Sequence, residues 1–162
     1  MAQVDYFIKI DDVKGESTDD KHKGEIDVES WSWGVTQQGT SGRGAGAGAG
    51  KALPQDFHFV KKHDKASPVL FIGCATGQHY KSAILTARKA GGGQQEYLKI
   101  TMEDVMVSSY QVGGAESSGV VPTDQIALNF AKIEISYKEQ KPDGGLGGEA
   151  KQKYDVAANK KV

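Results

Sequence analysis

Several features that would restrict the function of a protein are scarce in this 162-residue chain. It has one cysteine, Cys74, so no internal disulfide can form and the fold does not depend on an oxidising compartment. No run approaches the roughly 18 apolar residues that span a bilayer, so we expect no membrane insertion. The first residues contain no basic stretch followed by an apolar segment. We therefore expect synthesis in the cytoplasm and export, if any, without a cleaved signal peptide.

The chain also has no excess charge of one sign. Its formal net charge is -1, which argues against a dedicated nucleic-acid-binding protein. The charges are nevertheless unevenly distributed along the sequence. Residues 11–29 carry eight acidic groups and three lysines, net -5, whereas residues 43–99 carry nine basic and three acidic groups, net +6. This separation is either ordinary solvated surface or a pair of opposite faces that meet in a head-to-tail subunit contact.

Motifs for catalysis or for cofactor binding are missing as well. The glycine-rich segment 42–50 has Ala45 where a phosphate-binding loop requires glycine, and Ala52 where it requires Ser or Thr. There is no HExxH, paired CxxC or GxSxG. We regard Cys74 as a small apolar residue, His79 as a surface residue, and the pair Glu103 and Asp104 as a solvated bend. The sequence thus predicts no enzyme activity, no metal and no cofactor.

Alternation of apolar and polar residues with period two predicts that strands dominate the fold. Three of the predicted strands are long, and the apolar side chains of each change from one face to the other once, near Ser30, Glu103 and Ala131. Such a change marks a bulge or a corner where a strand enters another sheet. The simplest architecture is a mainly β protein, a small antiparallel barrel that is closed or nearly closed.

One short helix is predicted on the side of this barrel. Ser67 can cap it, Pro68 suits its first position, and Gly77 suits a left-handed end. We expect Val69, Leu70 and Ile72 to pack against the barrel. Residues 42–50 (GRGAGAGAG) predict a flexible arm between two strands, and residues 142–148 (PDGGLGG) predict a linker. The expected organisation is one domain over residues 1–141, followed by a linker and tail over 142–162.

Two segments near the start, DYFIKIDDVKGES (residues 5–17) and EIDVESWSWGV (residues 25–35), resemble one protein family closely. The resemblance continues through three further segments in the same order: FIGCATGQHYKSAILTARKA (71–90), EYLKITMEDVMVSS (96–109) and LNFAKIEISYKEQ (128–140). The family is Hcp, the ring-forming tube protein of bacterial type VI secretion systems. The resemblance covers most of the chain.

The resemblance implies a mechanical role. Hcp proteins form hexameric rings that stack into a tube, are driven outward by a contractile sheath beneath a spike protein, and carry effector proteins in their lumen. The family loop that contributes to contacts between stacked rings corresponds to residues 37–52. The stacking residues expected there are Gly42, Arg43, Gly44, Gly46, Gly48, Gly50 and Lys51. The competing interpretations are a monomeric soluble ligand-binding β-barrel and a hydrolase with an unrecognised site.

The lumen-facing residues follow from alternation around two tryptophans. If Trp31 and Trp33 point to the core, Ser30 and Ser32 point the other way, out of the barrel wall. We expect these two serines to face the lumen and the cargo.

Overall fold

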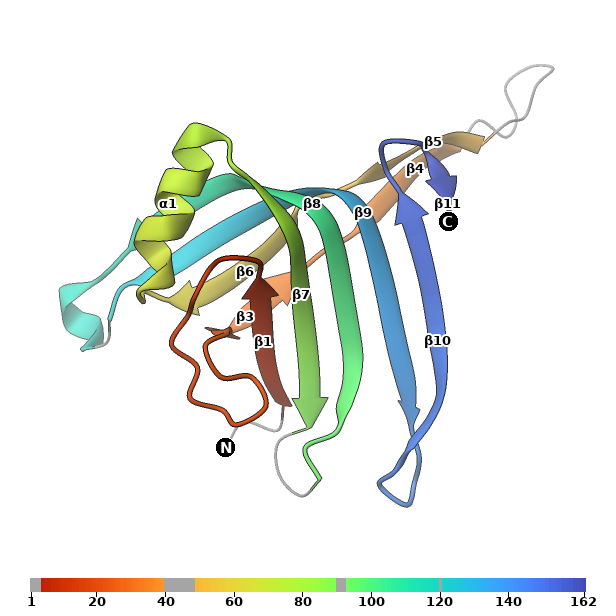
Figure 1. The fold of residues 1–162 in the computed structure, drawn as a ribbon, viewed down its shortest axis with the longest axis horizontal. Helices are drawn as coiled ribbons and strands as arrows, with labels where there is room; N and C mark the ends of the chain where they lie inside the picture. The colour runs from red at the N-terminus through yellow and green to blue at the C-terminus, as the bar shows by residue number, and fades with distance from the viewer. Residues whose placement is uncertain (1–3, 40–48, 90–92, 120) are drawn as a thin grey trace.

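The structure of this protein is a computed structural model that describes residues 4–39, 49–89, 93–119 and 121–162 (Figure 1). It is mainly β, with one α-helix and antiparallel strand pairs, as the sequence predicts. The strands are β1 (Val4–Ile10), β2 (Ile26–Val28), β3 (Ser30–Ser32), β4 (Val35–Gly39), β5 (Ala49–Pro54), β6 (Phe57–Lys62), β7 (His79–Lys89), β8 (Glu96–Gly113), β9 (Thr123–Gln140), β10 (Leu146–Asp155) and β11 (Lys160–Lys161). The helices are α1 (Ala66–Thr76) and a 3₁₀ turn, η1 (Glu116–Ser118).

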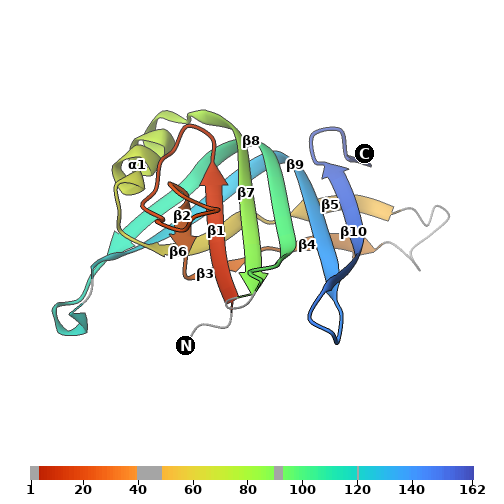
Figure 2. The same ribbon diagram turned by 60° about the horizontal axis from the view of Figure 1, so that its bottom comes forward.

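The main sheet curls, but it is not a closed barrel. Its strands follow the order β11-β10-β9-β8-β7-β1-β2, while β6 pairs with β9 and with β3. The chain bends at Glu29, so β2 pairs with β1 and β3 pairs with β6. The backbone N–H of Glu29 donates to Val60 O at 2.8 Å and holds this bend against β6. Of the two predicted alternatives, closed or nearly closed, the structure excludes the closed barrel. The segment around Glu29 pairs with β1 through β2 and with β6 through β3, and these two short strands do not form one continuous ladder (Figure 2).

The changes of face predicted near Glu103 and Ala131 are confirmed. Two of the register pairs place Ser82 opposite Glu103 and Glu103 opposite Lys132, so these bends lie side by side across three strands. Buried side chains change parity across this line in β7 (Tyr80 to Ala83), β8 (Met102 to Val105) and β9 (Phe130 to Ile133). Asp104 has a left-handed backbone (φ 52°) at the line. Three adjacent strands thus bend together, and the sheet folds over on itself.

The core lies inside this fold, where large side chains fill the space between the two parts of the sheet. Ile8, Leu85, Met102 and Leu128 have no exposed surface. Trp31 is half-buried, and its ring stacks on that of Phe57 with centroids 5.8 Å apart. Burial of aliphatic and aromatic side chains on this scale is the main source of folding free energy.

Helix α1 lies over the folded sheet but presents a different side from the one predicted. Leu70 is fully buried, whereas Val69 and Ile72 are 40% and 51% exposed. The buried positions Ala66, Ser67, Leu70 and Gly73 follow the spacing of three and four residues that defines one helical face. Four consecutive apolar residues conceal that spacing in the sequence.

The C-terminal end of α1 agrees with the prediction, and the N-terminal end does not. Gly77 closes the helix with φ 67°, and the N–H of Gln78 donates to Gly73 O at 3.0 Å. The predicted cap Ser67 instead lies inside the first turn. Asp64 takes the capping role, because its Oδ1 accepts the N–H of Ala66 at 2.9 Å.

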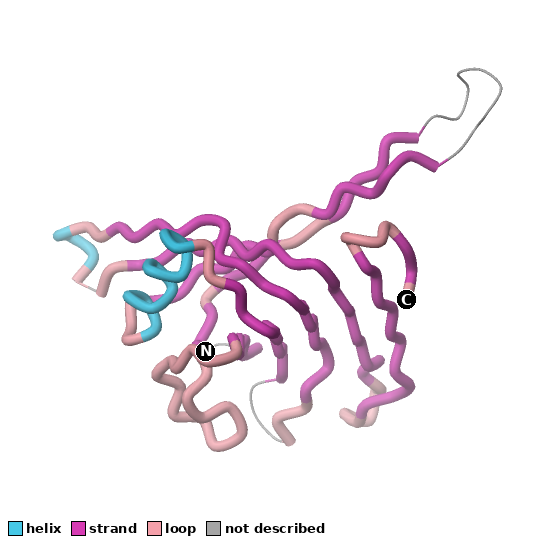
Figure 3. The backbone as a smooth tube through the Cα atoms, turned by 45° about the horizontal axis from the view of Figure 1, so that its top comes forward, coloured by secondary structure: helices cyan, strands magenta, loops and turns pink. Residues whose placement is uncertain are grey.

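Two predicted irregular segments contain strands. Residues 37–52 were predicted as a loop, but their ends belong to a ribbon in which β4 pairs with β5 and which projects away from the main sheet (Figures 1 and 3). Residues 142–162 were predicted as a linker and tail, yet within them Leu146–Asp155 forms β10 along the whole second half of β9. The added strand leaves the C-terminal residues beside the sheet edge.

Candidate functional site

An uncharged row of side chains crosses four strands on the outside of the fold. The registers join Ser32 to His58, His58 to Ala127, and Ala127 to Ser109. A second row joins Ser30, Val60, Gln125 and Gln111 in the same way. We call the surface formed by these eight residues the neutral face. Ser30, Ser32, His58, Gln111 and Gln125 are exposed on it.

The strands that form the neutral face keep their large aromatic and aliphatic side chains, apart from Val60, on the opposite side. Phe57, Phe59 and Ile126 alternate with the outward residues and are buried. On β3, Ser30 and Ser32 are exposed while the half-buried Trp31 packs against the core, so the two serines point out of the wall as predicted. That they face a lumen stays a prediction. Asp56 lies at the margin of the face, where its carboxylate accepts hydrogen bonds from Ser108 Oγ (2.6 Å) and Asn129 Nδ2 (3.0 Å). The Asp56 carboxylate therefore already accepts hydrogen bonds from two uncharged side chains of the same chain.

Two charged residues of the same strands are buried beneath the face, whereas Lys62 of β6 is exposed at its end. Lys61 and Asp124 are both without exposed surface. Lys61 Nζ donates to Asp124 Oδ2 at 2.9 Å, to Asp64 Oδ1 at 2.7 Å and to Ser67 Oγ at 2.7 Å. Burial raises the pKa of Asp124, but hydrogen bonds from Ser67, Lys61 and His63 outweigh it and leave that pKa below its usual value. The cluster ties the first turn of α1 to β6 and β9.

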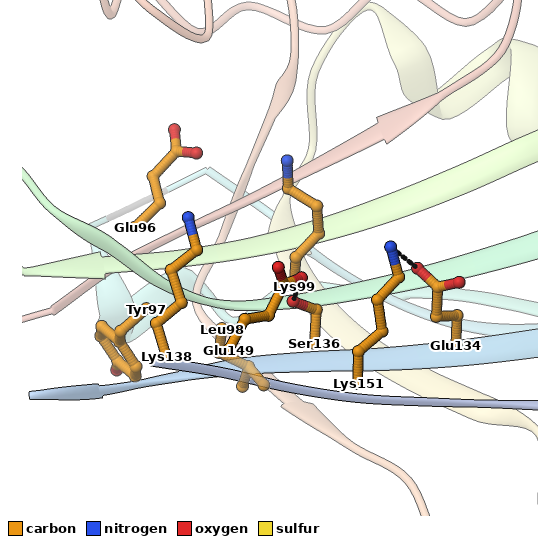
Figure 4. A pocket seen from close by; sticks show the side chains of 9 residues that line it. All are labelled: Glu96, Tyr97, Leu98, Lys99, Glu134, Ser136, Lys138, Glu149 and Lys151. Carbon is orange, nitrogen blue, oxygen red and sulfur yellow. Dashed lines mark hydrogen bonds and ion pairs between the residues drawn. The ribbon is translucent and has the colours of Figure 1, made fainter. Parts of the chain in front are cut away.

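A second surface, on β8, β9 and β10, has the opposite character (Figure 4). Alternating lysines and carboxylates lie on it, and we call it the charged face: Glu96, Lys99, Glu134, Lys138, Glu149 and Lys151. Lys151 Nζ lies 3.5 Å from Glu134 Oε1, and Ser136 Oγ donates to Glu149 Oε1 at 2.5 Å. That hydrogen bond lowers the pKa of Glu149. Its charges are interleaved, so neither sign forms a patch.

The acidic segment of residues 11–29 contacts the basic stretch within one chain. Arg88 donates to Asp19 Oδ2 at 2.8 Å and to Asp19 Oδ1 at 2.5 Å, which lowers the pKa of Asp19 to about 2. His22 lies between Glu25 Oε2 (2.9 Å) and Glu96 Oε1 (2.7 Å). The two stretches are therefore not simply opposite faces reserved for a neighbouring subunit, because some of their charges neutralise one another internally.

The residues predicted for ring stacking are only partly placed. Gly50 and Lys51 belong to β5, and Lys51 is exposed. Gly42, Arg43, Gly44, Gly46 and Gly48 lie outside the described residues. The sequence alone did not identify His58, Gln111 or Gln125, because registers between distant strands bring His58 beside Ser32 and bring Gln125 and Gln111 into the row of Ser30. The signal that could have found His58 is its place between the apolar residues Phe57 and Phe59. No such alternation surrounds Gln125, which stands between Asp124 and the apolar run 126–128.

Neither a metal-binding cluster nor a membrane-spanning helix occurs among the described residues. Within residues 4–39, 49–89, 93–119 and 121–162, no group of three His, Cys, Asp or Glu side chains could hold a metal ion. Over the same ranges, no helix has the length and apolar character needed to cross a membrane.

Comparisons with known proteins agree on one family. The family model described as "Type VI secretion system effector, Hcp" matches residues 7–137. The chain is 48% identical to protein hcp1 of Pseudomonas aeruginosa over 158 residues, which cover 96% of this chain and 97% of the relative.

Solved structures show the same similarity in three dimensions. A type six secretion system protein superposes with a TM-score of 0.92 at 32% identity, covering 99% of this chain and 100% of the other. Hcp1 from Salmonella typhimurium has a TM-score of 0.84 at 37% identity, with the same coverage. The fold, the sequence similarity and the family match lead to one conclusion. The chain belongs to the Hcp family of type VI secretion system proteins.

Proposed function

We propose that this chain is the ring subunit of a type VI secretion inner tube, with six copies joined head to tail. A heterologous contact between two different surfaces of identical chains closes into a ring when the rotation between them permits. The projecting ribbon of β4 and β5 supports such a contact, since its Val35 and Leu53 are 53% and 51% exposed. Apolar side chains on an arm that leaves its own domain need a neighbour to cover them.

The neutral face lines the channel of that ring and carries effector proteins. The observation that supports this most is that Ser32, His58 and Gln125 expose uncharged groups while Lys61 and Asp124 of the same strands are buried. A channel wall without fixed charges avoids juxtaposing like charges with a passing protein, which would cost free energy. Neutral hydrogen-bonding groups on the wall suit a cargo surface that is itself uncharged and hydrogen-bonding.

Rings stack head to tail through residues 37–52, with Gly42, Arg43, Gly44, Gly46, Gly48, Gly50 and Lys51 at the contact. The stacked tube acts with a spike protein and a contractile sheath. It assembles in the cytoplasm and is then secreted. Two observations support the proposed stacking: the family to which the chain belongs, and the position of β4 and β5 on a projecting ribbon.

Native mass spectrometry of the wild-type protein, co-expressed with the effectors of its own secretion system, tests the proposal. We expect a six-subunit ring with bound effector. Ser32→Arg places a charge in the channel wall and should leave the ring intact while effector is lost. Ser117→Arg, an exposed serine on η1, is the matched control and should retain effector. A monomer at every concentration, or equal effector on both variants, would contradict the proposal.

A further inference from the structure

His58 differs from the other three histidines of the chain. His22, His63 and His79 each lie within 3.0 Å of a carboxylate oxygen, from Glu25 and Glu96, from Asp124, and from Asp104 respectively. His58 is exposed, and its imidazole has no hydrogen bond or ion pair with the described residues. A positive charge on its imidazole would therefore have no partner within this part of the chain.

The surroundings of His58 on the neutral face are uncharged on both sides. Ser32 on β3 and Ala127 on β9 are its direct neighbours in the register. Ser109 lies beyond Ala127 in the same row, and Ser30, Gln125 and Gln111 belong to the adjacent row of the neutral face. These small or neutral side chains leave the imidazole as the prominent group of the row.

The nearest ionisable groups lie at the ends of the same surface. Asp56, two residues earlier on β6, is held by Ser108 and Asn129. Lys62, four residues later, and Glu29, just before β3, lie at the other end. His58 is thus the only histidine on a surface that is otherwise without charge in its middle.

We propose that His58 makes cargo binding depend on pH, and that the cargo surface it contacts is uncharged and hydrogen-bonding. This inference rests on the proposed function of the neutral face. Histidine is the side chain that changes charge between about pH 5 and 8. Enclosing an unpaired imidazolium against a neutral partner is unfavourable, because the charge loses its water without gaining a counter-charge. In a closed ring the charge recurs once per subunit, so acidification weakens cargo binding.

The test uses the effector that wild-type rings bind and Ser32→Arg rings lose. Its affinity for the intact ring is measured at about pH 8 and about pH 5.5. We expect wild-type binding to weaken by roughly tenfold at the lower pH, because an imidazole that is charged in the empty ring must lose its proton to bind. His58→Gln keeps a neutral hydrogen-bonding group and should bind equally at both values. His79→Gln removes an exposed histidine elsewhere and should retain the wild-type pH response.

Binding must also act back on the imidazole. If cargo prefers neutral His58, thermodynamic reciprocity requires that cargo suppress its protonation. NMR titration of the His58 ring should therefore show protonation at lower pH in the loaded ring than in the empty one. Equal pH dependence of wild type and His58→Gln, or tighter binding on acidification, overturns this inference while leaving the proposed function intact. Failure of Ser32→Arg to release any effector overturns both.

Discussion

The two halves of strand β9 expose surfaces of different character, one uncharged and one rich in charged side chains. In the first half, Gln125 faces outward on the neutral face while Asp124 is buried against Lys61. In the second half, Glu134 and Lys138 face outward among the lysines and carboxylates of β8 and β10. The change occurs at the bend between Phe130 and Ile133, where the buried parity switches.

The comparison shows where this protein places its charges. Both halves contain charged residues, but the half beneath the neutral face buries them at the cost of desolvation, which hydrogen bonds must offset. The other half leaves them in water, where ion pairs contribute little. A neutral outer surface with a buried ion cluster behind it is an arrangement that stability alone does not require. We attribute it to the proposed contact with cargo in the channel.

The largest expected difference between the halves is in the free energy of unfolding. Lys61→Met leaves the Asp124 carboxylate buried without its main counter-charge, which should cost about 3 to 5 kcal/mol. Lys151→Met on the charged face removes a 3.5 Å surface pair and should cost less than about 1 kcal/mol. Urea denaturation at one fixed protein concentration measures both. Similar losses of unfolding free energy for the two variants would show that the buried and exposed ion pairs contribute equally to stability.

The helix beneath the neutral half gives the next largest effect. Leu70→Ala should destabilise the protein by about 2 to 5 kcal/mol, because it empties a fully buried site. Ile72→Ala, at a side chain 51% exposed, should change stability by about 0.5 kcal/mol or less. The same denaturation experiment applies. A larger loss for Ile72→Ala would restore the helix orientation that the sequence predicted.

Acid should act on the part of the sheet where Arg88 binds Asp19. The pKa of Asp19 is about 2 in the folded protein, below the value of about 3.9 for an unfolded aspartate. Its stabilisation is therefore complete above about pH 4 and is lost as the pH falls toward 2. Asp19→Asn should flatten the pH dependence of unfolding over this range. An unchanged slope in the variant would show that other carboxylates carry the effect.

The smallest effect concerns the pairing of charges on the charged face. Exchanging Glu134 and Lys151 for one another keeps the net charge and the opposite signs, so stability should change by less than about 0.5 kcal/mol. Glu134→Lys alone places like charges together and should cost slightly more at low salt than at high salt. Thermal unfolding at two ionic strengths measures the difference. If the stability loss of Glu134→Lys did not depend on salt, repulsion between the introduced lysine and Lys151 would not be its cause.

Stacking supplies a kinetic test beside these equilibrium ones. If rings meet through residues 37–52, trypsin should cut at Arg43 and Lys51 more slowly in tubes than in dispersed rings. Gel electrophoresis of timed digests measures both rates, with total protein held constant. Equal rates would assign stacking to another surface.

Alternation in the sequence was sufficient to predict the strands that have one buried side. It placed Trp31 toward the core and Ser30 and Ser32 outward, and it located the bends near Glu103 and Ala131. It could not reveal Leu146–Asp155 as a strand, because this edge strand has no fully buried residue and therefore no apolar period. The continuous apolar run from Val69 to Ile72 likewise hid which side of α1 is buried.

The direction of single side chains on the neutral face could be predicted from the sequence, but the set of residues that meet there could not. Ser32 and His58 belong to strands whose pairing depends on the whole fold, as does the contact of Lys61 with Asp124, 63 residues away. Single-strand alternation gives the direction of a side chain but not its cross-strand neighbours. The same limit explains why the internal contact of Arg88 with Asp19 was not foreseen.

A cryo-electron-microscopy reconstruction of the purified assembly would show which face lines the channel. We expect a six-subunit ring in which Ser32, His58 and Gln125 line the central channel and the charged face of β8, β9 and β10 does not. A ring whose channel is lined by Lys99, Glu134 and Lys151, with the neutral face turned outward, would contradict it.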